Sequence, residues 1–231
     1  MIEFTIKLAD KVISINSNFE TTKKYCKDYL FNGEPDFFIS IDEKDIDFEI
    51  KLNKSSPMAS ELMALYRKIC YYMADYNTFM FHGSAWLYNE NGYIFTAPSG
   101  TGKSTHGEKW QRLFGAESIN DDKPLISLRG TPTVWGTPWM GKHKRGKNIS
   151  CPIKAICLIE RSETNRIERL SSKDAFDVIL KQSYIPHDAQ STAKVLSLAI
   201  ELSKSVSVYR LFCNMDDEAA FVSFGEMATN R

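Results

Sequence analysis

Apolar and polar residues alternate at the start of the chain and predict a strand. Every second residue of this stretch is apolar, the period of a strand with one buried face: Ile2, Phe4, Ile6 and Leu8. Similar short runs predict strands near residues 12–15, 37–41 and 48–52, and a short helix over residues 21–30. We therefore interpret residues 1–56 as a small, β-rich N-terminal subdomain.

A helical period replaces the alternation after residue 56. Ser55-Ser56-Pro57 is typical of a helix start, because a serine can cap the helix and proline fits its first turn. Apolar residues then recur at spacings of three and four: Leu62, Leu65, Ile69, Tyr72 and Met73. This spacing places them on one helix face, which indicates core packing.

Strands and helices alternate through the rest of the chain. The predicted strands cover residues 79–88, 93–96, 118–122, 153–160 and 206–212, and Asn91-Gly92 is expected to form the hairpin turn between the first two. The predicted helices cover residues 104–114, 172–183, 192–204 and 217–227. This order is typical of an α/β fold, and we assign residues 57–231 to one larger domain. The alternative is that residues 1–231 form a single domain.

Charge and composition exclude several classes of protein. The 29 Lys and Arg residues balance the 29 Asp and Glu residues, so we expect no nucleic-acid partner. No apolar run approaches the roughly 18 residues that span a bilayer, and the N-terminus does not resemble a signal peptide. We expect no membrane partner and a cytoplasmic location. The five cysteines contain no Cys-x-x-Cys pair, which favours reduced, partly buried thiols.

A glycine-rich loop between a predicted strand and a predicted helix carries the clearest chemical signal. In a Walker-type loop, backbone N–H groups wrap nucleotide phosphates, the lysine reaches the β- and γ-phosphates, and the next hydroxyl binds Mg²⁺. Gly102-Lys103-Ser104 matches that pattern, although Ala97 replaces the usual first glycine and must keep a negative φ. The candidate nucleotide-binding residues are Ser99, Gly100, Thr101, Gly102, Lys103, Ser104 and Thr105.

Two carboxylates and a histidine are candidates for the chemistry itself. Asp121 and Asp122 end a predicted strand, where one can act as a base while the other helps to hold Mg²⁺ or the lysine. Adjacent residues of a strand face opposite sides, so both can serve one site only if the strand has ended. His82 lies in an apolar run and is either a core residue or part of the site. His106 is expected to reach solvent or the edge of a nucleotide and is given no role.

A segment rich in tryptophan and glycine precedes a cluster of cations. Residues 135–139 read Trp-Gly-Thr-Pro-Trp, which predicts an ordered loop without regular structure. Lys142, Lys144 and Arg145 follow, and they could hold a transferring phosphate or an acidic substrate. The alternative is a solvated basic loop, and a lid that closes over ATP would agree with both interpretations.

The order of these motifs resembles the HPr kinase and phosphoenolpyruvate carboxykinase superfamily over residues 79–160. The resemblance rests on Ser99-Gly100-Thr101-Gly102-Lys103-Ser104, on Ile119-Asn120-Asp121-Asp122 and on His82-Gly83. It implies a carboxykinase-like P-loop domain with a twisted mixed sheet and flanking helices, in a stand-alone protein similar to HPr serine kinases. It is also compatible with a homo-oligomer, a form common among such kinases, although the sequence leaves the oligomeric state open.

The resemblance also implies roles for individual residues. Lys103 would contact the β- and γ-phosphates, Ser104 would bind Mg²⁺, and Asp121 would be the base. Asp122 would support the metal or Lys103, and His82 would line the same pocket.

The activity implied is a kinase that depends on ATP and Mg²⁺ and phosphorylates a serine-like hydroxyl of a peptide, a protein or a small metabolite. The main alternative is a regulatory or assembly module that binds ATP without transferring phosphate. A decarboxylating carboxykinase is a third interpretation, for which 231 residues are too few to supply the full site.

Overall fold

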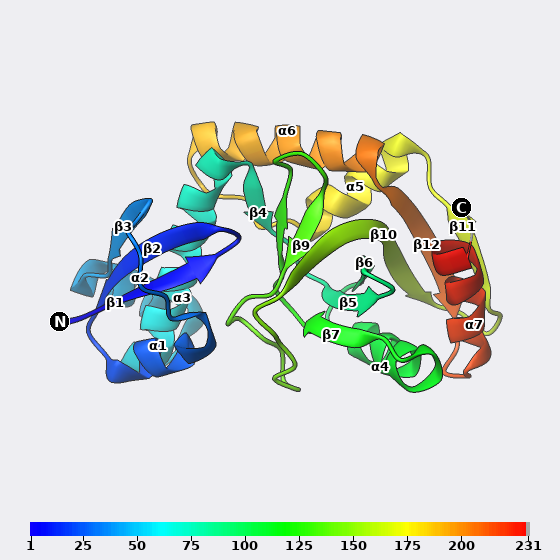
Figure 1. Cartoon of the computed structure of the whole chain (residues 1–231), viewed down its shortest axis with the longest axis horizontal. Coiled ribbons are helices and arrows are strands. Elements are labelled where there is room, and N and C mark those ends of the chain that lie inside the picture. The colour runs from blue at the N-terminus through cyan, green and yellow to red at the C-terminus, as the bar shows by residue number, and fades with distance from the viewer. Residues whose placement is uncertain (230–231) are drawn as a thin grey trace.

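Strands near the N-terminus, where apolar and polar residues alternate, form a small sheet. The structure is a computed structural model and describes residues 1–229. Strands β1 (Ile2–Leu8) and β2 (Lys11–Ser17) form an antiparallel hairpin, and β3 (Phe37–Ser40) lies parallel to β2. Helix α1 (Glu20–Tyr25) and the 3₁₀ turn η1 (Lys27–Tyr29) cover the predicted helical stretch. This sheet lies at one end of the molecule (Figure 1).

The prediction of a strand over residues 48–52 is wrong, because these residues belong to helix α2 (Glu43–Asn53). Asp42 and Asp45 form a reciprocal capping box that fixes the helix start. Within the helix, the side chain of Phe48 is 46% exposed while Glu49 is buried against Arg67 of the next helix. The alternating residues therefore lie in a helix, whose start is fixed by the capping box and whose inner face is fixed by contacts with the next helix.

Helix α3 (Pro57–Met73) begins where the sequence predicts, with Ser56 capping it and Pro57 in its first turn. Its buried face packs in one apolar cluster with the β1–β3 sheet, and Trp139 of the larger part joins the same cluster. The 3₁₀ turn η2 (Ala74–Tyr76) follows directly. The predicted division at residues 56 and 57 stays a prediction.

The rest of the chain forms a mixed sheet of nine strands with flanking helices. The path through the sheet is β4-β8-β9-β10-β6-β5-β7, with β12 on β10 and β11 on β12. The strands are β4 (Thr78–Met80), β5 (Ser84–Tyr88), β6 (Asn91–Thr96), β7 (Glu117–Asn120), β8 (Leu125–Ser127), β9 (Thr133–Trp135), β10 (Ser150–Arg161), β11 (Arg166–Arg169) and β12 (Ser207–Cys213). β6, β10 and β12 are parallel, so their carboxyl ends meet at one edge of the sheet.

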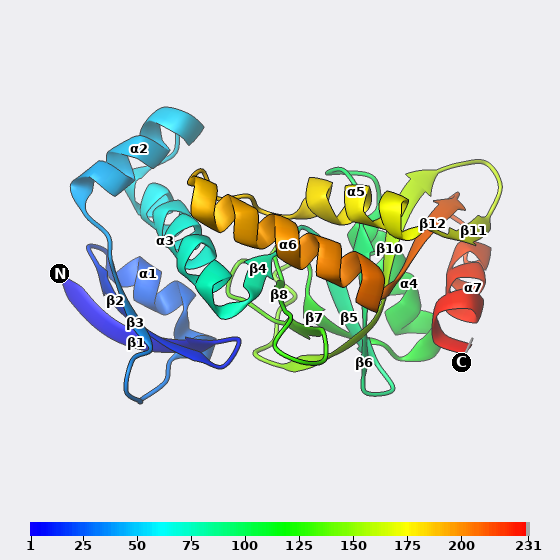
Figure 2. The same cartoon turned by 90° about the horizontal axis from the view of Figure 1, so that it is seen from above.

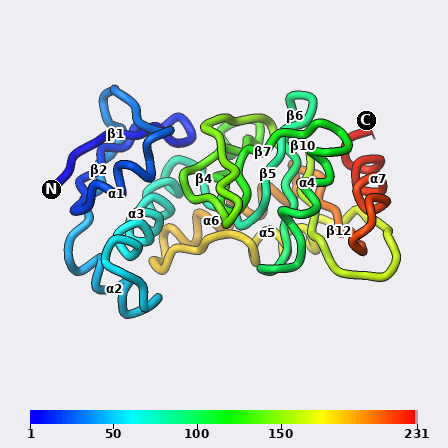
Figure 3. Tube along the Cα trace, turned by 90° about the horizontal axis from the view of Figure 1, so that it is seen from below, coloured from blue at the N-terminus to red at the C-terminus, as the bar shows by residue number. Residues whose placement is uncertain are grey.

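Helices cover both faces of this sheet. Helices α5 (Ser172–Gln182) and α6 (Ala189–Ser205) pack on one face, and α4 (Lys103–Phe114) and α7 (Glu218–Phe224) pack on the other. A π-helical turn, η3 (Gly225–Thr229), follows α7. Figure 2 shows α5 and α6 side by side, and Figure 3 shows the two termini at opposite ends of the molecule. The expected α/β architecture with a mixed sheet is therefore present.

Three details of the larger sheet differ from the sequence prediction. The run predicted as one strand over residues 79–88 is broken between β4 and β5, because the backbone N–H of His82 turns away to the carbonyl of Gln182. The hairpin turn falls on Asn89 and Glu90, which both have positive φ, and not on Asn91-Gly92. Trp135, assigned to a loop, ends strand β9, where it pairs with strands on both sides.

The cysteines and the helix lengths bear on two predictions made from composition. All five cysteines are buried free thiols, as expected. None of the helices within residues 1–229 has the length and apolar character that a bilayer span requires.

Candidate functional site

The glycine-rich loop joins β6 to α4 at the edge where the parallel strands end. Gly100 has φ +78° and Gly102 has φ +126°, values that favour glycine over any other residue. No atom lies within 4 Å of where a Cβ would stand on either glycine. The loop therefore leaves open space against its backbone, as a phosphate cradle requires.

Ala97, in the position of the usual first glycine, is accommodated without strain. It is fully buried and is not among the residues with positive φ. A Cβ is tolerated at negative φ. Ala97 therefore meets the condition of a negative φ under which it can replace the usual first glycine.

Lys103 points back over the loop that precedes it. Its ammonium donates to the carbonyl of Ala97 at 2.9 Å, and it is 8% exposed. Burial lowers the pKa of Lys103, while the nearby Asp122 carboxylate acts in the opposite direction. Gly102 is the N-cap of α4 and has no side chain to accept from the first N–H groups of the helix. These N–H groups therefore remain available to an anion at the loop.

Asn120 builds the turn that carries the two carboxylates. Its side-chain oxygen accepts from the backbone N–H of Asp122 at 2.9 Å and of Lys123 at 2.7 Å. Its amide donates to the carbonyl of Thr137 at 3.0 Å, which ties the turn to the tryptophan-rich segment. β7 ends at Asn120, so Asp121 and Asp122 follow the strand and line the same cavity. The requirement that the strand has ended is thus fulfilled.

The two adjacent carboxylates have opposite surroundings. Asp121 is 3% exposed, and its Oδ1 accepts from the backbone N–H of Gly141 at 2.8 Å, whereas its Oδ2 has no hydrogen-bond partner within residues 1–229. Asp122 lies beside His82, with 3.4 Å between Nε2 and Oδ1, and forms an ion pair with Lys123. Burial opposes its ionisation, but hydrogen bonds from His82 and Lys123 outweigh burial and hold the pKa of Asp122 at about 2.

His82 is fixed from both sides of its ring. Its Nδ1 lies 3.1 Å from the side-chain oxygen of Gln182, the last residue of α5, and its Nε2 faces Asp122. Its backbone N–H donates to the Gln182 carbonyl at 2.7 Å. Because an amide oxygen accepts, the Gln182 contact fixes Nδ1 as a donor and holds Nε2 toward Asp122.

The predicted basic residues lie in different places. Lys142 lines the cavity, Lys144 is exposed outside it, and Arg145 pairs with Glu108 of α4 at 3.1 Å. Of the three, Lys142 is thus the residue placed to contact a ligand in this cavity. His143, which the sequence did not single out, also lines the cavity.

These elements enclose a cavity of about 400 Å³. The candidate residues that line it are His82, Ser99, Gly100, Gly102, Lys103, Ser104, Thr105, Asp121, Asp122 and Lys142. Thr101, also predicted to bind nucleotide, lines a second cavity on the other side of the loop. The structure therefore brings together His82, the loop and both carboxylates, from the segments that follow β4, β6 and β7.

The donors in this cavity suit Mg²⁺ together with phosphate. No group of three or more His, Cys, Asp or Glu residues within the described part of the chain could hold a metal alone. The cavity offers the Ser104 hydroxyl and the ionised Asp122 carboxylate. Mg²⁺ is typically held by one or two carboxylates and by substrate phosphates, so this donor set fits the ion.

The fold and the site thus define an α/β protein with a strand–glycine loop–helix unit facing two adjacent carboxylates. No family model and no curated protein sequence matches the chain. Among solved structures, the chain is similar to the Hpr(Ser) kinase/phosphatase from Coxiella burnetii, with a TM-score of 0.34 and 9% sequence identity. That similarity covers 62% of this chain and 90% of the other. At this level the similarity shows no family and carries no argument about activity.

Proposed function

We propose that the protein is a kinase that depends on ATP and Mg²⁺ and transfers the γ-phosphoryl group to a hydroxyl of a peptide, a protein or a small metabolite. The observation that carries the proposal is the unpartnered Oδ2 of Asp121, buried in the cavity that also holds Lys103 and Ser104. A buried carboxylate oxygen without a partner is costly, and such groups cluster where a proton or a ligand is handled.

The residues of the loop would bind the phosphates. Backbone N–H groups at the start of α4 and the Lys103 ammonium would surround them, and Lys103 would exchange its bond to the Ala97 carbonyl for one to phosphate oxygen. Ser104 and Asp122 would hold Mg²⁺, which neutralises phosphate charge when it is bound.

Asp121 would act as the base. Its Oδ2 would accept the proton of the acceptor hydroxyl while the new O–P bond forms and the bond between the γ-phosphorus and the β–γ bridging oxygen breaks. The Gly141 N–H keeps Oδ1 occupied at 2.8 Å, so the carboxylate presents Oδ2 to the acceptor. Lys142 at the rim would attract the charge of the transferring group.

Calorimetric titration and a transfer assay test the proposal together. ATP should bind to the parent and to Asp121→Asn with affinities within a fewfold, whereas Lys103→Ala should lose at least tenfold and the exposed control Lys173→Ala should lose none. Phosphate transfer from ³²P-labelled ATP to a pool of serine-containing peptides and metabolites should require Asp121. Transfer by Asp121→Asn at the parental rate would refute the base assignment.

The same assay separates the kinase from the module that binds ATP without transfer. Binding that needs Lys103, with no labelled product from the parent in any pool, would favour the module. No observation within the described residues favours the module over the kinase at present, because a regulatory nucleotide site has no need for a buried, unpartnered carboxylate oxygen.

A further inference from the structure

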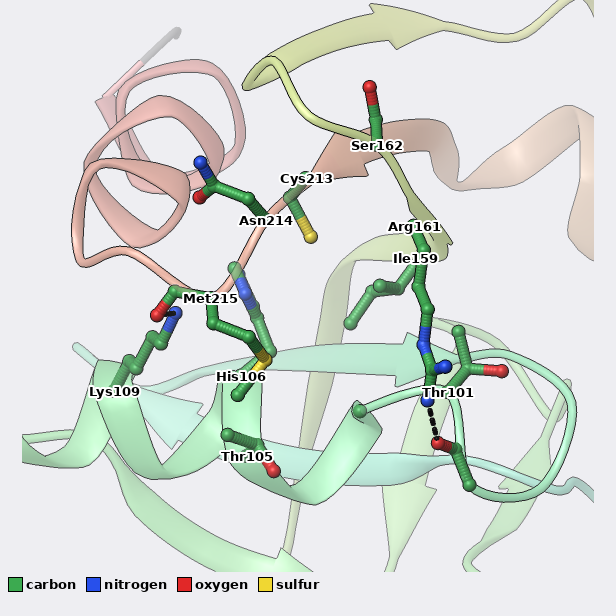
Figure 4. A pocket seen from close by; sticks show the side chains of 12 residues that line it. Thr101, Thr105, His106, Lys109, Ile159, Arg161, Ser162, Cys213, Asn214 and Met215 are labelled. Carbon is green, nitrogen blue, oxygen red and sulfur yellow. Dashed lines mark hydrogen bonds between the residues drawn. The ribbon is translucent and has the colours of Figure 1, made fainter.

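A second cavity lies across the glycine-rich loop from the first. It has a volume of about 470 Å³ and lies between α4, the end of β10 and the segment that joins β12 to α7. Figure 4 shows side chains from these three elements converging on one space. The volume is within the range of pockets that bind small molecules.

The two cavities meet at the loop itself. Gly100, Gly102 and Thr105 line both of them. Apart from the adjoining residues, no atom lies within 4 Å of the missing Cβ of Gly100 or Gly102, so neither glycine is covered at these points of the loop. A ligand whose charged part occupies the first cavity can therefore extend an attached group into the second.

The lining of the second cavity favours a flat, uncharged group. Ile159, Cys213 and His106 are among the residues that line it. His106 is 3% exposed, not at the solvent as predicted, and its Nε2 lies 2.9 Å from the Ser223 hydroxyl. Burial, with a smaller effect of Lys109, lowers the pKa of His106 to about 3, so its ring is neutral at physiological pH.

Two polar side chains of the wall, Lys109 and Asn214, are already occupied by protein partners. The Lys109 ammonium donates to the carbonyls of Met215 and Asp216, each at 2.7 Å. The Asn214 amide donates to Asp216 Oδ2 at 2.9 Å, and its oxygen accepts from the Asp216 N–H. Lys109 is therefore not free to bind a further phosphate group, and Arg161 is the remaining charged side chain in the lining.

Arg161 stands at the edge of this cavity and next to the loop. One nitrogen of its guanidinium donates to the Gly100 carbonyl at 2.6 Å, as the dashed line in Figure 4 shows. The side chain is exposed, and a planar guanidinium stacks well on an aromatic ring. Arg161 is thus placed to cover a flat ring that enters the cavity beside the loop.

We propose that the second cavity binds the nucleoside of the nucleotide and that Arg161 covers its base. The proposal rests on the proposed function, because it takes the phosphates to lie in the first cavity. It adds a binding site formed by β10, α4 and the segment before α7, which the loop motif by itself does not identify.

Comparing ATP with inorganic tripolyphosphate tests this assignment, since tripolyphosphate carries the phosphates without the nucleoside. Calorimetry with Mg²⁺ would be run on the parent, Arg161→Ala and Met215→Trp, a large side chain introduced at an exposed residue of the cavity edge. The matched controls are Arg169→Ala, an exposed arginine on strand β11, and Met63→Trp, an exposed methionine on helix α3.

Both cavity variants should weaken ATP binding, Met215→Trp by at least tenfold and Arg161→Ala by at least fivefold. Tripolyphosphate should bind all proteins within twofold of the parent. ATP affinities equal to the parent, or equal losses for both ligands, would overturn the nucleoside assignment while leaving the phosphate site intact. Failure of both ligands to bind the parent would instead refute the proposed function and the nucleoside site with it.

Discussion

Asp121→Asn and Asp122→Asn are expected to change stability in opposite directions, although the two residues are neighbours. Asp122 has a folded-state pKa of about 2 against an ordinary value of 3.8. At roughly 1.4 kcal/mol per pKa unit, its ion pairs contribute about 2 kcal/mol to the free energy of unfolding at neutral pH. Asparagine removes the charge, so Asp122→Asn should lose about 1–2 kcal/mol.

Asp121 presents the reverse case. Its buried Oδ2 has no partner, and an unsatisfied buried group costs about 1–3 kcal/mol, more when it is charged. Asparagine keeps an oxygen for the Gly141 N–H and removes the charge. Asp121→Asn should therefore raise the free energy of unfolding by about 1 kcal/mol while it abolishes phosphate transfer.

Urea unfolding followed by tryptophan fluorescence measures both effects on equal terms, with the parent as reference. Because the pKa of Asp122 is lowered on folding, its contribution is complete above pH 4 and is lost as the pH falls toward 2. The deficit of Asp122→Asn should shrink over that pH range. Equal destabilisation by both substitutions at pH 7 would refute this account of the two carboxylates.

Three further predictions follow from single contacts. Gln182→Ala frees the His82 ring and should lower kcat about tenfold with the KM for ATP within twofold; steady-state ADP release measures both, and a change in KM alone would contradict a positioning role. Gly107→Ala would place a Cβ 2.0 Å from the Trp86 indole and should cost roughly 2–3 kcal/mol in urea unfolding, so an unchanged midpoint would contradict the packing. ATP and GTP should bind within about fivefold in calorimetry, because the Asn214 amide is occupied and cannot read a base edge.

The sequence predicts the parts of the fold that local pattern controls. The glycine-rich loop lies where its motif places it, because the positive φ of Gly100 and Gly102 is a property of the residue type. Helix α3 begins at Pro57 because its cap and first turn are local as well. The error over residues 48–52 also has a local cause, since Asp42 and Asp45 signal a helix start that the alternation obscures.

The parts that the sequence misses depend on distant partners. Gln182 reaches His82 across 100 residues, so no local pattern identifies Gln182 as a site residue. The contact of Asn120 with Thr137 spans 17 residues and is not visible in a local pattern either. Strands β8 and β9 have three residues each, too few to show a period. Asn120 does have a local signal for its role in the turn, which is its residue type. Asparagine before a turn often accepts backbone N–H groups two and three residues later.

The different roles of the two carboxylates depend on this same turn. An extended chain would send Asp121 and Asp122 to opposite faces, but the Asn120 side chain ends the strand and brings both into one cavity. There, a contact with His82 and the ion pair with Lys123 stabilise the Asp122 carboxylate, while Asp121 keeps an oxygen without a partner at a cost in stability. Two identical side chains thus acquire different surroundings: hydrogen bonds stabilise the Asp122 carboxylate, whereas one oxygen of Asp121 has no partner within the described residues. A substitution at Asn120 should therefore affect both roles at once, whereas a substitution at either aspartate affects one.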